Sequence, residues 1–270
     1  RTPAEAQQDQ RRTRLLEINA AAAKYFNYVL LSHRGGQAGR DYVARRGLSE
    51  ATVEAFQLRF SLPEWSHLLS YLTDKKGFEI EEVEAAGLAI QREHGGYYDR
   101  FRGRVIFPIR NAKGETVAFG GRALGDEQPK YLNSPQTPLF DKSAVLYGLD
   151  LARSEIRTRD AVVIVEGYVD VLTAHQYGFR NVVAPLGTAL TGGHVALLKK
   201  LSRNIFLALD ADAAGQKATE RGLSTLLSNI EGRQSFAVPV AGNLFHFARE
   251  IEGKVRVIAL PDGRDPDEVI

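Results

Sequence analysis

Apolar residues recur at helical spacing through most of the first ninety residues. Along residues 13–31 they return every three or four positions, and the pair Gly35-Gly36 follows, so a helix is predicted there. Shorter patterns of the same kind predict further helices over residues 38–46, 50–57, 64–76 and 79–86. Ser49 is the expected N-cap of the helix at 50–57, because its hydroxyl can accept a hydrogen bond from the first turn.

The pattern changes to strands after residue 97. Apolar positions in 104–109 and 116–119 flank the sequence Asn111-Ala-Lys-Gly114, which favours a β-hairpin. Farther on, apolar runs predict strands over residues 161–165, 181–186, 204–209 and 254–260. Helical patterns over 170–177, 191–202 and 214–230 separate them. Strands that alternate with helices over short links are typical of a parallel sheet covered by helices.

We therefore predict an α/β chain in two parts. Residues 1–143 form a mixed α+β N-terminal subdomain, and residues 144–270 form an α/β domain with a central, largely parallel sheet. The chain has 270 residues, of which 44% are hydrophobic, enough to bury a substantial core. No apolar run approaches the roughly 18 residues of a membrane-spanning helix, so we expect no membrane partner.

The charge and the cysteine content limit which partners and which kinds of catalytic or metal site this sequence can have. There are 35 Lys+Arg against 33 Asp+Glu, so the net charge of +2 does not by itself point to a polyanionic partner. The absence of cysteine excludes disulfides, thiolate catalysis and cysteine-based zinc sites within these residues. The six histidines do not form a metal-binding set, and His94 and His194 are expected to be solvated.

Carboxylates follow three of the predicted strands. Glu166 and Asp170 follow the first, Asp210 and Asp212 the third, and Asp262 the last. The carboxyl ends of parallel strands meet at one edge of a sheet, where ligands bind. Oxygen ligands without His or Cys favour Mg²⁺ or Mn²⁺, and such a site suits phosphoryl or nucleotidyl transfer. Helix capping is an equally good explanation of any one of these acids, but a poor one of all three groups together.

Basic residues gather between Arg100 and Arg122, where six positive charges stand against one acid. If Arg100, Arg102 and Arg104 lie on a strand, all three face the same side, because alternate residues of a strand do so. Such a row could follow a nucleic-acid backbone, and arginine can also stack on bases. A solvated strand surface is the plainer alternative for this segment taken alone.

These motifs, taken in their order along the chain, resemble those of a known protein family. Glu166 after an apolar strand, followed by Asp210-Ala-Asp212, resembles the Toprim signature shared by DnaG-type primases, topoisomerases, OLD-type nucleases and RecR-like proteins. Upstream stand the Arg100–Ile109 segment, Gly120-Gly121-Arg122, the run from Lys130 to Lys142, and Leu146-Tyr-Gly-Leu149. In this order they resemble the RNA-polymerase core of bacterial DnaG-type primases, from about residue 34 to residue 270.

That resemblance implies roles for individual residues. Glu166, Asp210 and Asp212 would hold the metal, Mg²⁺ or Mn²⁺, while Asp170 and Asp262 would complete a catalytic acidic patch. The basic ridge that guides template and incoming nucleotides in the family corresponds here to eight residues: Arg46, Arg100, Arg102, Arg122, Lys130, Tyr131, Asn133 and Lys142. Asp141 and Ser143 depart from the His and Gly expected on either side of Lys142.

The implied activity is DNA primase activity. Short RNA primers would be made for replication on a single-stranded DNA template, from ribonucleoside triphosphates, by metal-dependent nucleotidyl transfer. The resemblance also implies a place in the bacterial cytoplasm, at the replication fork. The sequence leaves the oligomeric state open, and a monomer is the expectation. Zinc, and contact with the replicative helicase, would belong to an N-terminal and a C-terminal domain of the full-length family that are not found in this chain.

Two other classes of function remain open. Another Toprim enzyme, a topoisomerase or a nuclease, would use the same carboxylates. A topoisomerase needs a strand-passage domain that does not fit in this length, and a nuclease leaves the run from Lys130 to Lys142 unexplained. A non-catalytic Toprim scaffold could bind DNA, but RecR-type proteins carry cysteine–zinc and helix-hairpin-helix elements that are not seen here.

Overall fold

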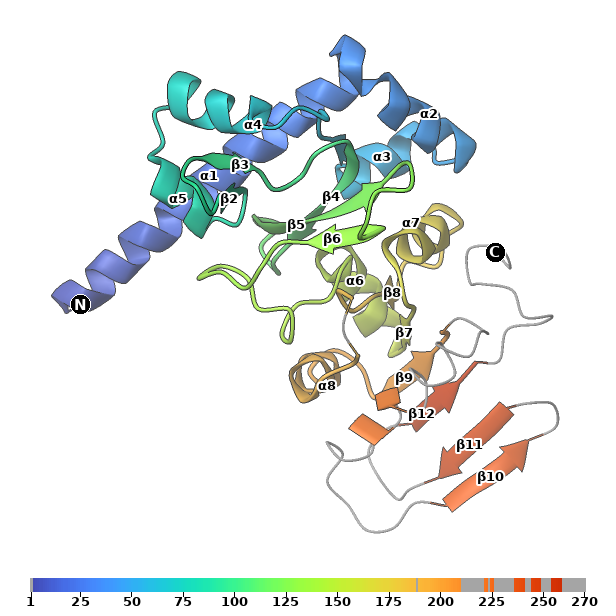
Figure 1. Cartoon of the computed structure of the whole chain (residues 1–270). Helices are drawn as coiled ribbons and strands as arrows, with labels where there is room; N and C mark the ends of the chain where they lie inside the picture. Colours follow the sequence, from blue (N-terminus) through green and yellow to red (C-terminus); the bar gives the residue numbers. More distant parts are fainter. Residues whose placement is uncertain are drawn as a thin grey trace. The chain divides into compact units, whose positions relative to one another are not determined.

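The computed structural model describes residues 2–187, 189–209, 221–222, 224–225, 236–240, 244–248 and 254–258, with the backbone alone for 236–240, 244–248 and Lys254. The chain divides into two compact units, Arg1–Asp141 and Lys142–Ile270, each with its own sheet (Figure 1). No helix in the described part of the chain is both long and apolar enough to cross a bilayer.

The first 85 residues of the first unit contain five α-helices, with β1 between the third and the fourth, and every helix predicted in this region is present. They are α1 (Pro3–Leu31), α2 (Gln37–Arg45), α3 (Glu50–Phe56), α4 (His67–Ser70), which continues as a π-helical turn over Tyr71–Lys75, and α5 (Ile80–Ala85). α1 begins ten residues earlier than predicted, because Thr2 and Glu5 form a capping box around Pro3. Ser49 caps α3 as expected, since its Oγ accepts a hydrogen bond from the Thr52 N–H at 3.2 Å.

The first unit also contains an antiparallel sheet, whose strands lie in the order β1-β4-β5-β6. Its strands are β1 (Arg59–Phe60), β4 (Arg104–Arg110), β5 (Thr116–Ala123) and β6 (Tyr131–Asn133). β4 and β5 pair directly across the turn at Asn111–Gly114, which confirms the predicted hairpin. α1 packs on this sheet, with the rings of Phe26 and Phe119 in edge contact at 5.6 Å. A small second hairpin joins β2 (Ala89–Gln91) to β3 (Tyr97–Asp99).

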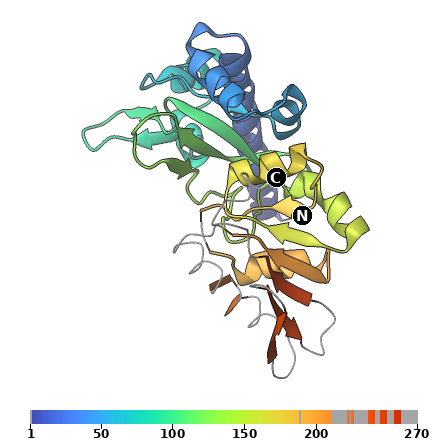
Figure 2. The ribbon, with the colours of Figure 1, turned by 90° about the vertical axis from the view of Figure 1, so that its right-hand side faces the viewer.

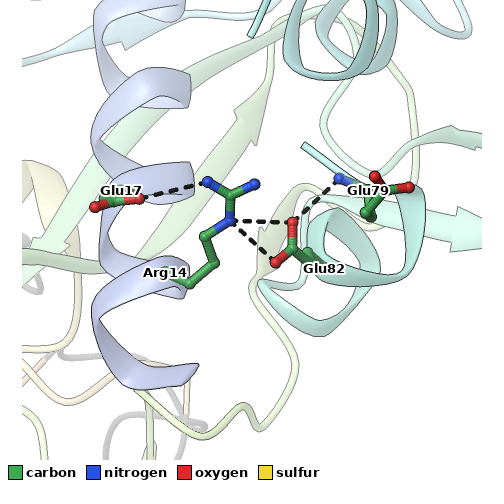
Figure 3. A network of polar contacts seen from close by, with 4 residues as sticks. All are labelled: Arg14, Glu17, Glu79 and Glu82. Carbon is green, nitrogen blue, oxygen red and sulfur yellow. Dashed lines mark hydrogen bonds and ion pairs between the residues drawn. The ribbon is translucent and has the colours of Figure 1, made fainter. Parts of the chain in front are cut away.

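A polar contact ties α1 to α5 on the surface of this unit (Figure 3). Arg14 donates from Nε to both carboxylate oxygens of Glu82, at 3.0 and 3.2 Å, and Glu82 also accepts the backbone N–H of Glu79. The guanidinium of Arg14 lies over the Phe78 ring at 4.5 Å. The hydrogen bond from Arg14 lowers the pKa of the Glu82 carboxyl.

The second unit contains the predicted parallel sheet. Its elements are α6 (Leu149–Arg159), β7 (Val162–Ile164), α7 (Tyr168–Gln176), β8 (Val182–Val183), α8 (Gly192–Lys199), β9 (Asn204–Leu207), β10 (Phe236–Val240), β11 (Leu244–Ala248) and β12 (Lys254–Val257). Strands β12, β9, β7 and β8 are parallel and adjacent in that order, which confirms the α/β class.

Two features of this unit were not predicted. α6 buries Leu149, Ala152 and Ile156 in the same core as α8 and strands β7 and β9. β10 and β11 form an antiparallel hairpin that extends the sheet beyond β12, and both lie in the segment 231–253 that had no predicted element (Figure 1, Figure 2). The helix predicted over 214–230 lies mostly outside the described residues.

Candidate metal site and nucleic-acid interface

Glu166 lies where the strand pattern placed it, just beyond the carboxyl end of β7. It borders a cavity of about 220 Å³ at the carboxyl ends of β7, β8 and β9. The remaining lining is mostly apolar: Ile164, Pro185, Gly187, Ala189, Leu190, Leu207, Leu209, Arg221 and Gly222. A carboxylate in a mostly apolar lining is the kind of polar group that gives a ligand pocket its chemistry.

Asp170 shapes the turn that carries Glu166. Its carboxylate accepts a hydrogen bond from the Gly167 N–H at 2.8 Å, and the side chain is buried in the first turn of α7. A Cβ added to Gly167 would stand only 3.0 Å from the Asp170 oxygen, so a larger residue there would push the carboxylate away. Asp170 therefore holds the link between β7 and α7 in a fixed shape next to Glu166.

The other predicted acids lie outside the described residues: Asp210, Asp212 and Asp262. Within the described ranges, no three Asp, Glu, His or Cys side chains come close enough together to hold a metal ion. Leu209, which directly precedes Asp210, does line the cavity that Glu166 borders. The donor set predicted from the sequence is made of carboxylate oxygens only, which fits a hard divalent cation.

Lys142 lies on a loop that is tied to the start of α8. His194 is fully buried, and its Nε2 donates to the Lys142 carbonyl at 2.9 Å and the Val145 carbonyl at 3.1 Å. Thr191 donates from Oγ1 to the Ser143 carbonyl at 2.6 Å. The expectation that His194 is solvated is wrong, because the ring is needed to satisfy these loop carbonyls.

The row of arginines that a strand over residues 100–104 would form is not present. Arg100 and Arg102 lie in the link between β3 and β4, and only Arg104 belongs to a strand. Arg100 donates to the Asn133 carbonyl, at 3.2 Å from Nε and 2.9 Å from Nη2. Arg104 is buried and donates to the Pro129 carbonyl at 2.8 Å. These two side chains brace the strands β4–β6, because buried guanidinium groups must find acceptors.

Three of the predicted ridge residues meet around one tyrosine that the sequence analysis missed. The Arg122 guanidinium lies 4.8 Å from the Tyr42 ring centroid and 6.0 Å from that of Tyr131, and the Arg46 guanidinium lies 5.8 Å from Tyr42. We call this set the Tyr42 cluster: Tyr42, Arg46, Arg122 and Tyr131. Tyr42 falls on the apolar face of α2, and its buried position gave no sequence signal of a functional role.

Arg102 belongs to a second group, here called the Trp65 cluster: Trp65, Arg92, Tyr98 and Arg102. The Arg102 guanidinium lies 4.2 Å from the Trp65 ring centroid, and that of Arg92 lies at 5.2 Å. Trp65 is 56% exposed, so its ring is available to a partner. Lys130 is exposed as well, one residue before Tyr131. Arginines stacked on accessible aromatic rings form a surface suited to single-stranded nucleic acid.

Comparisons with known proteins identify the family of this chain. The family model described as "DNA primase catalytic core, N-terminal domain" matches residues 25–153, and the model described as "Toprim domain" matches residues 160–234. The DNA primase of Halalkalibacterium halodurans is 42% identical over 258 residues, which are 95% of this chain and 39% of that protein. The chain thus spans about two fifths of that relative's length.

Solved structures give the same family. A crystal structure of a DNA primase domain from Pseudomonas aeruginosa has a TM-score of 0.83 and 40% identity, covering 94% of this chain and 74% of that one. A structure of a DnaG primase catalytic domain bound to ssDNA has a TM-score of 0.81 and 32% identity, covering 97% and 75%. The match to residues 25–153 does not favour the topoisomerase, nuclease and scaffold alternatives. On fold, motif order and similarity, this chain belongs to the DnaG-type DNA primases, to the part that forms their catalytic core.

Proposed function

We propose that this chain synthesises short RNA primers on single-stranded DNA from ribonucleoside triphosphates. The observation that carries the proposal is the position of Glu166, beside a cavity at the carboxyl ends of β7, β8 and β9 in a member of the primase family. In an open parallel sheet this edge is where catalytic ligands bind. Residues 144–270 would hold the reaction centre, and residues 1–143 would guide the template.

The proposed cofactor is Mg²⁺, with Mn²⁺ as a substitute. Glu166, Asp210 and Asp212 would hold it, and Asp262 would add negative charge to the same edge. A bound divalent cation lowers the pKa of a nucleophilic hydroxyl and offsets negative charge on the phosphate under attack. Asp170 contributes through the Gly167 hydrogen bond, which keeps the turn after β7 in one conformation beside Glu166.

Template binding is assigned to the two arginine–aromatic clusters. A DnaG catalytic domain similar to this chain has been solved with ssDNA, so DNA is the proposed polyanionic partner here. The guanidinium groups of Arg46, Arg102 and Arg122 would pair with phosphates, and the exposed Trp65 and Tyr131 rings would stack on bases. Arg100, Lys130 and Asn133 would support the β6 end of this surface.

Lys142 is proposed to contact the triphosphate of the incoming nucleotide, from the loop that Thr191 and His194 hold in place. The protein would act as a monomer at the bacterial replication fork, in the cytoplasm. Zinc and the replicative helicase would be bound by other domains of the full-length protein.

The test supplies the chain with a single-stranded template, an annealed RNA primer, ribonucleotides and MgCl₂, and follows extension on a gel. We expect template-directed extension that Glu166→Gln reduces about 100-fold or more, because the amide removes the anionic ligand. Glu155→Gln is the matched control, since this side chain pairs with Arg159 on the surface of α6. Equal extension by wild type and Glu166→Gln would refute the proposed reaction centre, and cleavage of the template in place of extension would indicate a nuclease.

A further inference from the structure

Asp99, at the end of β3, forms backbone hydrogen bonds with two members of the Trp65 cluster. Its backbone N–H donates to the Trp65 carbonyl at 2.7 Å, and its own carbonyl accepts from Arg102 Nη1 at 2.6 Å. One residue therefore links the backbone of the tryptophan to the side chain of the arginine that stacks on it. Asp99 is only 3% exposed, so it is available to neither DNA nor bulk solvent.

The carboxylate of Asp99 fixes the segment that follows Trp65. Its two oxygens accept separate backbone N–H groups at the start of α4, from Leu68 and Leu69, each at 2.8 Å. α4 is four residues long, continues into the π-helical turn and begins two residues after Trp65, so this contact caps its first turn. Helices this short have little stability of their own and depend on such contacts.

We infer that Asp99 is a positioning residue for the Trp65 cluster: it sets the placement of Trp65 against Arg102, and through it the affinity for single-stranded DNA. The inference rests on the proposed DNA-binding role of this cluster. Asp99 itself contacts no substrate, and its effect passes through the two side chains that it places.

The charge on Asp99 makes this placement sensitive to pH. Burial raises the pKa of the Asp99 carboxyl to about 6, against the opposing effects of the two backbone N–H groups, His67 and Arg102. From α1, Tyr25 also faces this group, and its hydroxyl lies 2.7 Å from His67 Nδ1. A protonated oxygen becomes a donor, so one of the two α4 N–H groups loses its acceptor below this pH. The segment that carries Trp65 is then held less firmly.

Trp65 is the only tryptophan in the sequence, so intrinsic fluorescence reports on this position directly. The experiment titrates the full chain without DNA from pH 8 to pH 5, with far-UV circular dichroism to verify the fold. We expect the Trp65 emission of wild type to change with a midpoint near pH 6. Asp99→Asn should abolish that transition. Asp74→Asn is the control, because this carboxylate is exposed on the π-helical turn, and it should retain the transition.

DNA affinity is measured with a fluorescent oligo-dT at pH 7.5. Asp99→Asn should bind about tenfold more weakly, because the amide can accept only one of the two α4 N–H groups. The slope of affinity against salt should not change, since no arginine or lysine is removed. A structural collapse of the surface would lower that slope as well.

The outcomes separate the inference from the proposed function. A pH transition that persists in Asp99→Asn overturns the positioning role, whatever the DNA affinity. If Trp65→Ala and Arg102→Ala bind oligo-dT as wild type does, the DNA-binding role of the cluster fails even where the fluorescence transition depends on Asp99. If Asp99→Asn does not fold, wild type and His67→Gln decide. If wild type and His67→Gln show the same fluorescence midpoint near pH 6, the transition is assigned to Asp99. If His67→Gln shows no transition, it is assigned to the histidine instead.

Discussion

Arg122 on β5 and Tyr131 on β6 lie opposite each other in the strand pairing, and the guanidinium carbon stands 6.0 Å from the tyrosine ring centroid. The same guanidinium lies closer still to Tyr42, at 4.8 Å. Its Nε is buried and has no hydrogen-bond partner among the described residues. Two aromatic rings and a hydrogen bond from Nη1 to the Ala123 carbonyl at 3.3 Å thus hold this arginine in place without neutralising its charge, which is what a phosphate-binding group requires.

Arg122→Lys should lower the affinity for single-stranded DNA about tenfold although the charge is kept, because an ammonium group cannot lie flat between two rings. Arg122→Ala should weaken binding further and reduce the salt slope by about 1, as expected for one lost phosphate contact. Fluorescence anisotropy at several salt concentrations measures both quantities. Lys113→Ala, on the exposed turn of the β4–β5 hairpin, should bind as wild type does. If Lys113→Ala lost as much DNA affinity as Arg122→Ala, DNA binding would depend only on the total charge of the protein.

His194→Ala should destabilise the second unit by about 2 kcal/mol, because the carbonyls of Lys142 and Val145 lose their buried donor. In a chain that still folds, the KM for ribonucleotides should rise more than kcat falls, since the Lys142 loop is no longer fixed. Urea unfolding and steady-state kinetics give the two measurements. His94→Ala replaces an exposed histidine in the β2–β3 turn and should change neither. A fall in kcat alone would contradict the assigned role of the loop.

Asn19→Leu should stabilise the first unit by about 1–2 kcal/mol. Asn19 lies on the buried face of α1, is fully inaccessible, and neither its amide nitrogen nor its oxygen has a hydrogen-bond partner among the described residues. A leucine of similar volume removes that desolvation cost. Asn27→Leu, on a partly exposed position of the same helix, should stay within about 0.5 kcal/mol of wild type. A destabilised Asn19→Leu would show that a buried water satisfies the amide.

The titration of Asp99 should also appear in the overall stability, and its sign follows from linkage. In the folded chain the carboxyl has a pKa of about 6, above its value of 3.8 when unfolded, because burial disfavours the charge. Between these values the folded state binds more protons than the unfolded state, so stability from this group increases as the pH falls. The unfolding free energy of wild type, relative to Asp99→Asn, should therefore rise from pH 7 to pH 4, by at most about 1.4 kcal/mol per pH unit. A relative fall over this range would contradict the assignment.

Local patterns predicted the elements that depend on local chemistry. The helices of the first unit, the Ser49 cap and the β4–β5 hairpin all follow from spacing, capping residues and turn residues. The parallel sheet followed from alternating runs, because a strand that is buried on both faces must be apolar throughout. α6 was missed, since seven of its eleven residues are charged or polar and the segment resembled a linker.

The site was harder to predict than the fold. The position of Glu166 beyond the carboxyl end of β7 could be predicted, because strand ends converge at one edge of a parallel sheet. The row of arginines depended on a strand over 100–104, and it fails because β4 begins at Arg104, where the apolar run over 104–109 had placed the strand. His194 and Tyr42 gave no signal at all, since their importance comes from carbonyls and guanidinium groups that approach from distant parts of the chain.

The β10–β11 hairpin changes which strand borders the parallel sheet. Without it, β12 would present a row of unpaired backbone groups that another chain could extend. With it, the outermost strand is β10, which contains Pro239. Proline has no N–H to offer and is tolerated in sheets at such borders. The edge strand β10 thus carries a proline, which makes it a poorer template for an added strand than β12 would be.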